Sequence, residues 1–153
     1  MQFLLVNPFI YDFSAYDLWV RPLGLMYIGA FLRSRGHEVH LLDFLDRSRM
    51  PDSEKNDHGC GRGKFFRVRA EKPEIYRDIP RRFWRFGLSE DAAAEALANV
   101  PAPDAVFVTS GMTYWYTGVR DTISFLRGVL PDVPVFLGGT YATLLPEHAR
   151  EHS

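Results

Sequence analysis

The stretch PVFLGGTYATLLPEH, residues 134–148, decides how the rest of this sequence is interpreted. Its apolar start predicts a buried strand over residues 133–137, and this strand runs directly into Gly138-Gly139 and a segment rich in hydroxyl groups. A glycine pair at a strand end indicates either a tight backbone turn or a ligand that lies close to the main chain. A turn suffices to explain an isolated pair. The choice therefore depends on what the other strand ends carry.

Further short apolar runs predict strands, and amphipathic segments between them predict helices. The predicted strands cover residues 3–6, 38–44, 105–109 and 133–137, and the predicted helices cover 22–35, 89–99 and 119–130. Ser89 is the expected N-cap of the second helix. Short apolar strands joined by helical connections are typical of a parallel sheet that is covered on both faces. We therefore expect an α/β fold with a doubly wound, mostly parallel sheet in strand order 2-1-3-4.

A fifth strand is expected beside strand four, but the sequence does not supply one. Residues 145–153, LPEHAREHS, predict only the opening of a helix. The fifth strand of the sheet is therefore expected to be missing. We interpret residues 1–153 as a single α/β domain at the N-terminus of a longer polypeptide.

Composition excludes several classes of protein. The chain has 153 residues, is 46% hydrophobic and 24% charged, and carries a net charge of −1. Its longest uninterrupted apolar stretch, residues 23–32, is half of the roughly twenty residues that a membrane span requires. Cys60 is the single cysteine, so this chain alone can form no internal disulfide and cannot hold an iron–sulfur cluster. With no leader peptide in the N-terminal residues, we expect a cytoplasmic protein without a membrane partner.

The long segment between strands two and three, about residues 46–88, is basic and aromatic. Residues 58–86 contain nine Lys or Arg against three Asp or Glu, interleaved with six aromatic rings. Such a mixture can stack nucleobases and neutralise phosphates. No recognised nucleic-acid motif accompanies it and the pI is about 6.5, so nucleic acid is not the favoured partner. We expect an ordered excursion that packs its rings on a partner domain and leaves its guanidinium groups in water.

Three local motifs resemble known sites and fail on context. GCGRGK at 59–64 lacks the Ser or Thr that must follow the lysine of a phosphate-binding loop. The dinucleotide fingerprint GxGxxG is absent after strand one, where NPFIYDF stands. HAREH at 148–152 matches the inverted zinc-protease pattern, but a zinc site needs a third protein ligand and a pocket. We therefore expect no metal ligands in this chain.

In a doubly wound sheet, ligands bind outside the carboxyl ends of the strands at the switch point, here between strands one and three. Three loops meet there: residues 7–19, 110–118 and 138–143. They are aromatic and carry hydroxyl groups, without the charge cluster that a phosphate site needs. These loops therefore suit a broad, flat ligand with amide-like edges better than a nucleotide.

Four sequence features together resemble one known family. They are Asn7-Pro8, RPLGLMYIGAFLRSRGHEV at 21–39, the turn from Ser110 to Thr113, and GGTYATLLPEH at 138–148. This combination is similar to the N-terminal cobalamin-binding domain of cobalamin-dependent radical S-adenosylmethionine enzymes, over nearly the whole chain. The resemblance implies a flavodoxin-like fold in which the strand-four glycines let the corrin ring or its nucleotide tail approach the backbone. The cobalamin contacts that it implies are Gly138, Gly139, Tyr141, Ala142 and Thr143, with Asn7, Pro8, Ser110, Met112 and Thr113 assigned more loosely.

Two departures limit what the resemblance implies. The cluster motif CxxxCxxC is absent, so we assign no catalytic residue. The iron–sulfur cluster and S-adenosylmethionine would belong to a downstream radical domain, in cis or in trans, that carries out methyl transfer or related radical chemistry. The DxHxxG motif that supplies a histidine to cobalt is also absent, since Phe13 and Ser14 follow Asp12. The alternative hypothesis is a non-catalytic α/β interaction module that docks a protein or RNA partner through the basic excursion.

Overall fold

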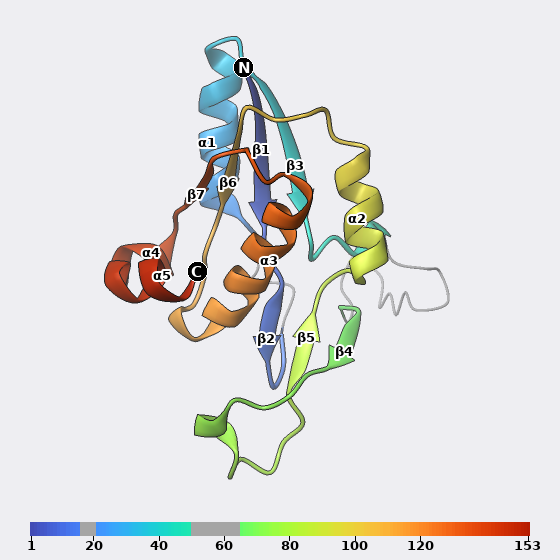
Figure 1. Ribbon diagram of the computed structural model, residues 1–153, viewed down its shortest axis with the longest axis vertical. Helices are drawn as coiled ribbons and strands as arrows, with labels where there is room; N and C mark the ends of the chain where they lie inside the picture. The colour runs from blue at the N-terminus through green and yellow to red at the C-terminus, as the bar shows by residue number, and fades with distance from the viewer. Residues whose placement is uncertain (16–20, 50–64) are drawn as a thin grey trace.

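The computed structural model describes residues 1–15, 21–49 and 65–153, and its main feature is a four-stranded parallel sheet (Figure 1). The strands are β1 (Gln2–Asn7), β3 (Glu38–Asp43), β6 (Ala105–Val108) and β7 (Val135–Leu137), in the order β3-β1-β6-β7. This arrangement confirms the predicted α/β class, the parallel pairing and the order of the four strands. Strand β7 begins two residues later than expected, because the Val133 amide still donates to Leu130 O in the preceding turn.

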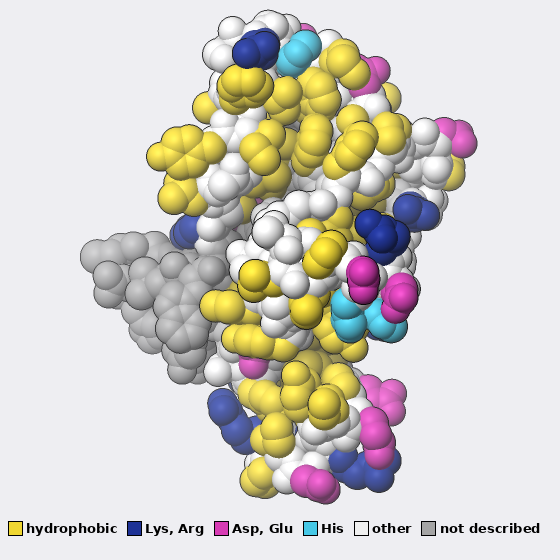
Figure 2. Space-filling model, turned by 90° about the vertical axis from the view of Figure 1, so that its left-hand side faces the viewer, with side chains coloured by type: hydrophobic (Ala, Val, Ile, Leu, Met, Phe, Trp, Pro, Cys, Tyr) yellow, Lys and Arg dark blue, Asp and Glu magenta, His cyan; other side chains and the backbone are white. Residues whose placement is uncertain are grey.

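Helices lie on both faces of this sheet. Helix α1 (Leu23–Ser34) covers one face with Leu25 and Gly29, and it exposes apolar side chains on its outer surface (Figure 2). Alternate residues of β1 face it: Phe3 and Leu5 belong to the same buried cluster as Leu25. The predicted first helix is thereby confirmed.

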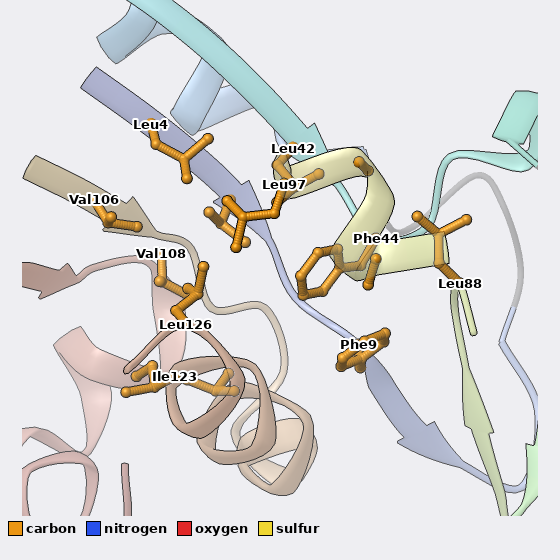
Figure 3. Close-up of a cluster of buried hydrophobic side chains, with 14 residues drawn as sticks. Leu4, Phe9, Leu42, Phe44, Leu88, Leu97, Val106, Val108, Ile123 and Leu126 are labelled. Atoms are coloured by element: carbon orange, nitrogen blue, oxygen red, sulfur yellow. The ribbon is translucent and has the colours of Figure 1, made fainter. Parts of the chain in front are cut away.

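The opposite face carries α2 (Glu90–Ala98) and α3 (Tyr116–Val129). Leu4 of β1 packs there in the largest core cluster, together with Leu97 of α2 and Leu126 of α3 (Figure 3). Ser89 caps α2 as predicted, because its hydroxyl accepts a hydrogen bond from the Ala92 amide at 3.2 Å. None of the helices in the described part of the chain is long and apolar enough to cross a membrane.

The chain ends in two short helices, α4 (Thr140–Leu144) and α5 (Pro146–His152). The proline stands in the first turn of α5, where its missing amide hydrogen costs nothing. Both helices lie beyond the carboxyl end of β7 (Figure 1). Helix α5 confirms the helix expected to open in residues 145–153, whereas α4 forms where a loop was expected over residues 138–143.

A second, antiparallel sheet of three strands was not predicted. It consists of β2 (Ile10–Asp12), β5 (Trp84–Phe86) and β4 (Arg67–Arg69), in the order β2-β5-β4. The expectation that residues 7–19 form a plain loop is therefore wrong at its start. Short 3₁₀ turns occupy Arg47–Arg49, Glu74–Tyr76 and Thr113–Trp115. The GCGRGK motif and Cys60 lie outside the described residues.

Some aromatic rings of the basic excursion are buried within this chain and are not exposed for contact with a partner. Phe65 and Phe86 are buried within the chain, in a cluster with Ile10, Leu45 and Trp115. The expectation that these two rings pack on a partner domain is wrong, because the small sheet packs them against the carboxyl end of the main sheet. Arg67 and Arg69 are exposed at its surface, as expected. Arg85 is buried instead, because its guanidinium lies 4.4 Å from the centroid of the Phe9 ring and donates to the Leu88 carbonyl.

Candidate functional site at the strand ends

A cavity of about 260 Å³ opens where β1 and β6 end. Its lining comes from residues 7–10 after β1, 21–24 at the start of α1, 109–111 after β6, and 139–140 after β7. These segments are far apart in the sequence and meet because all four elements end or begin at one edge of the parallel sheet. The cavity thus lies at the switch point, where the sequence predicted a ligand.

Contacts within the protein determine the backbone conformation of Gly139 and require glycine there. Its φ of +94° and ψ of −171° belong to a region that only glycine occupies readily. A Cβ atom at this position would collide with the backbone of Ser110, and it would lie 2.7 Å from the Ser110 nitrogen. The Thr140 amide also donates to Ser110 O at 2.9 Å. Close packing of two strand-end loops therefore explains Gly139 without a ligand.

Ser110 joins these two loops through its hydroxyl group. Its side chain is buried, donates to the carbonyl of Gly138 at 2.6 Å and accepts from the amide of Ala142 at 3.3 Å. Both hydrogen bonds are internal, so the hydroxyl fixes the wall of the cavity. The contribution of Ser110 to a ligand would come from its backbone, which lines the cavity.

Asn7 at the end of β1 and Asp43 at the end of β3 form a partly buried polar pair. The Asn7 side-chain amide donates to Asp43 Oδ1 at 2.8 Å, and the Leu45 amide donates to the same oxygen at 2.9 Å. Burial raises the pKa of Asp43, and these two hydrogen bonds oppose the rise. The positive charge of Arg21, which lines the cavity, opposes it less strongly. This side of the cavity is therefore polar and contains a guanidinium group.

Gly24 and Gly138 differ from Gly139, because no contact that the structure shows among the described residues requires them to be glycine. Neither has a positive φ, and a Cβ atom at either position would meet no other atom within 4 Å. In the first turn of α1, Gly24 forgoes up to about 1 kcal/mol of helix propensity relative to alanine. It lines both the strand-end cavity and a neighbouring groove of about 350 Å³ between α1 and β7, which Gly138 also lines. Open backbone surface of this kind leaves room for a ligand.

The predicted contact residues fall into two groups. Those that line the strand-end cavity or the neighbouring groove are Asn7, Pro8, Ser110, Gly138 and Gly139. Those that line neither are Met112, Thr113, Tyr141, Ala142 and Thr143. The first group comes from the strand ends themselves, and the second from α4 and from residues 112 and 113 at the start of the Thr113–Trp115 turn.

Tyr141 shows why the second group is set apart. Its side chain is fully buried, and its hydroxyl forms a 2.8 Å hydrogen bond with Nδ1 of His148 in α5. Tyr141 therefore holds α4 and α5 together. Thr143 has a similar internal role, since its hydroxyl donates to the Gly139 carbonyl at 2.9 Å.

Sequence reasoning missed several lining residues, above all Arg21 and Gly24. Both belong to the RPLGL segment that contributed to the family resemblance, but they were interpreted only as the start of a helix. Trp115, which belongs to the predicted loop 110–118, also lines the cavity, and its indole nitrogen donates to Asp12 Oδ2 at 2.8 Å. The one signal in the sequence was the presence of a glycine in the first turn of a predicted helix. Glycine has a low helix propensity, so its presence there indicates another role.

The described histidines lie away from the cavity. His148 and His152 stand side by side on α5 with ring centroids 4.2 Å apart, and His37 and His40 lie near β3. Within residues 1–15, 21–49 and 65–153, no group of three or more His, Cys, Asp or Glu side chains could hold a metal ion. The HAREH pattern thus forms a pair of imidazoles.

Comparison with protein-family models, with curated proteins and with solved structures found no match for this chain. The cavity must therefore be judged by its own groups. It offers backbone amides, threonine hydroxyls, one guanidinium and bare glycine surface, and its described lining contains no acid, histidine or cysteine. This set of groups is suited to binding a ligand.

Proposed function

We propose that this chain is a cobalamin-binding module, and that it serves radical S-adenosylmethionine chemistry in a separate domain. The observation that carries the proposal is the strand-end cavity with Gly24 at its rim, a bare backbone position that the packing of the protein does not require. The four features of the family resemblance contribute to the same edge of the sheet. The sheet order is compatible with the flavodoxin-like fold that this family implies.

The residues at the cavity fit one edge of such a cofactor. Cobalamin has amide side chains and a phosphate-bearing tail, and the cavity lining includes the guanidinium of Arg21 and the hydroxyl-bearing residues Thr109 and Thr140, which are the kinds of group that bind such substituents. A cavity of about 260 Å³ would hold only part of the cofactor, so the remainder would lie over the strand ends. When bound, cobalamin would supply the organocobalt chemistry, and the protein would orient it and exclude water.

The partner in this proposal is the domain with the iron–sulfur cluster and S-adenosylmethionine, in cis or in trans. By resemblance, methyl transfer or a related radical reaction is the process to which the module would contribute.

A second candidate function has one specific observation in its favour. Strand β4 is an edge strand of the small sheet, and it presents Arg67 and Arg69 to solvent. The Arg67 guanidinium lies 4.1 Å from the centroid of the Trp84 ring. Such an exposed, positively charged edge could dock an acidic protein segment or RNA without any cofactor.

One experiment separates the two functions. The protein is mixed with hydroxocobalamin, passed through a desalting column, and examined for visible absorbance in the protein fraction. We expect a coloured complex in near-stoichiometric amount, while the same column run with a short mixed-sequence RNA retains none at physiological salt. A colourless protein that retains RNA would favour the interaction module and contradict the proposal.

A further inference from the structure

Helix α1 is apolar around its circumference up to Leu32, and its last turn carries Arg33. Residues 23–32, LGLMYIGAFL, contain no charged side chain, and Leu25 and Gly29 are the residues buried against the sheet. The apolar side chains that remain exposed are Leu23 (66%), Met26 (48%), Tyr27 (71%), Ile28 (44%) and Phe31 (54%). Figure 2 shows hydrophobic side chains gathered over this part of the molecule. A helix that is apolar on every side is normally buried on every side.

The sheet beside α1 is also uncovered. The groove of about 350 Å³ between α1 and β7 is lined by Ile28, Phe107 and Phe136, among others. The rings of Phe107 and Phe136 stack with centroids 5.3 Å apart, and Phe136 is 52% exposed although it lies in the middle of a strand. Parallel sheets occur with both faces covered. On the other face α2 and α3 provide that cover, whereas here α1 stands alone among the described residues.

We propose that a second copy of this chain covers the face. In this arrangement α1 of one copy lies in the groove between α1 and β7 of the other, and two-fold symmetry places the second α1 in the first groove. In each copy, the α1 face of the sheet then carries two helices, its own α1 and that of the partner copy. Such an interface is isologous, since the same surface is used on both sides.

Charge and area both agree with a second copy as the occupant. Residues 23–32 are uncharged, so two α1 helices can pack together over this stretch without burying an unpaired charge. The cations at the helix end, Arg33 and the Arg35 guanidinium 4.3 Å from the centroid of the Phe31 ring, are exposed. An aromatic side chain has roughly 150–250 Å² to bury, so at their exposed fractions the five side chains of α1, two of them aromatic, present on the order of 500 Å². With Phe136 and the groove floor added, each copy approaches the roughly 800 Å² that a standard interface buries per partner.

The inference does not depend on cobalamin. The groove is a separate cavity from the one at the strand ends, although Gly24, Thr109 and Gly139 line both. A failure of the dimer would leave the cofactor proposal standing, and the reverse also holds. A further segment of a longer polypeptide, a partner helix from another protein and a lipid surface are the rival occupants.

The test is sedimentation equilibrium over a wide range of protein concentration, with three variants. Tyr27→Lys and Ile28→Lys each place a charge in the proposed interface, and Ile75→Lys is the matched control, since Ile75 is 84% exposed on the Glu74–Tyr76 turn. We expect the wild type and Ile75→Lys to form dimers, and each α1 variant to weaken the dimer by about tenfold or more because a buried unpaired charge is costly. Circular dichroism and urea unfolding establish that each variant is folded.

Three results would overturn the proposal. The first is a wild-type protein that stays monomeric at every concentration. The second is a dimer that both α1 variants leave unchanged. The third is a monomer that sediments with phosphatidylcholine vesicles and loses this property in Tyr27→Lys, which would assign the face to a lipid surface.

Discussion

At the scale of single residues, Gly138 and Gly139 are neighbours with different roles. Replacing Gly139 by alanine forces a side chain into a glycine-only conformation and against the Ser110 backbone, so we expect a loss of about 2 kcal/mol or more in the free energy of unfolding. Gly138→Ala is the matched control, and its effect should stay within about 0.5 kcal/mol. Urea unfolding measures both values, and equal losses would show that this account of Gly139 is wrong.

Asp43 makes the stability of the fold depend on pH, and the direction follows from its raised pKa. Because burial raises its pKa in the folded protein, folding favours the protonated form, and stability is lost as the pH rises from the ordinary aspartate pKa through the raised one. Asp43→Asn keeps an oxygen that can accept from Asn7 and Leu45 and removes the charge. We expect the variant to gain stability relative to wild type as the pH rises from about 4 towards neutrality. Urea unfolding at a series of pH values checks this, and a difference that is constant with pH would contradict it.

Sequence reasoning found part of the site at this scale. Asn7, Pro8, Ser110 and Gly139 follow directly after strands, so the rule for parallel sheets was enough to bring them together. Arg21 was missed because it lies before a helix, and only the tertiary packing of α1 turns it to the cavity. Tyr141 was placed among the contacts by resemblance, and its burial against His148 is a tertiary fact that no local pattern contains.

At the scale of elements, the cap of α2 was predictable because its signal is local. Ser89 precedes a helix with Glu90 and Asp91 in the first turn, and its hydroxyl accepts from the Ala92 amide. Ser89→Ala should therefore lower the free energy of unfolding by about 1 kcal/mol. The control is Ser34→Ala at the exposed end of α1, where the hydroxyl donates to the Phe31 carbonyl and a smaller loss is expected. Thermal and urea unfolding compare the two variants, and a Ser89 loss no greater than the Ser34 loss would count against the cap.

The strands divide into those that the sequence predicts and those that it does not. The four strands of the main sheet are apolar runs bounded by helices, and their parallel order followed from connection rules. Strands β2, β4 and β5 have three residues each, which is too short for an alternating pattern. Ile10 also pairs with Phe86, far away in the sequence, so this contact depends on tertiary packing.

At the scale of the whole molecule, charge is segregated towards the excursion. A surface that attracts RNA only through its net charge releases counterions on binding, so affinity falls steeply with salt. We expect any RNA binding by this protein to be weak, insensitive to base sequence and lost at physiological ionic strength. Fluorescence anisotropy with two RNAs of different sequence, at rising salt concentration, measures this. Sequence-selective binding that survives physiological salt would assign the basic edge of β4 a nucleic-acid function.

The central claim is that the bare backbone at Gly24 leaves space for cobalamin at the strand-end cavity. The most direct measurement is an equilibrium titration of hydroxocobalamin into wild type, Gly24→Leu and Gly128→Leu. Both positions are glycines in helices with nothing within 4 Å of a Cβ atom, but Gly128 does not line the cavity. Both variants should be at least as stable as wild type, since the helix propensity of leucine is roughly 0.8 kcal/mol more favourable than that of glycine. We predict that Gly24→Leu weakens binding by about tenfold or more and that Gly128→Leu leaves it unchanged; equal affinity of Gly24→Leu and wild type would contradict the account.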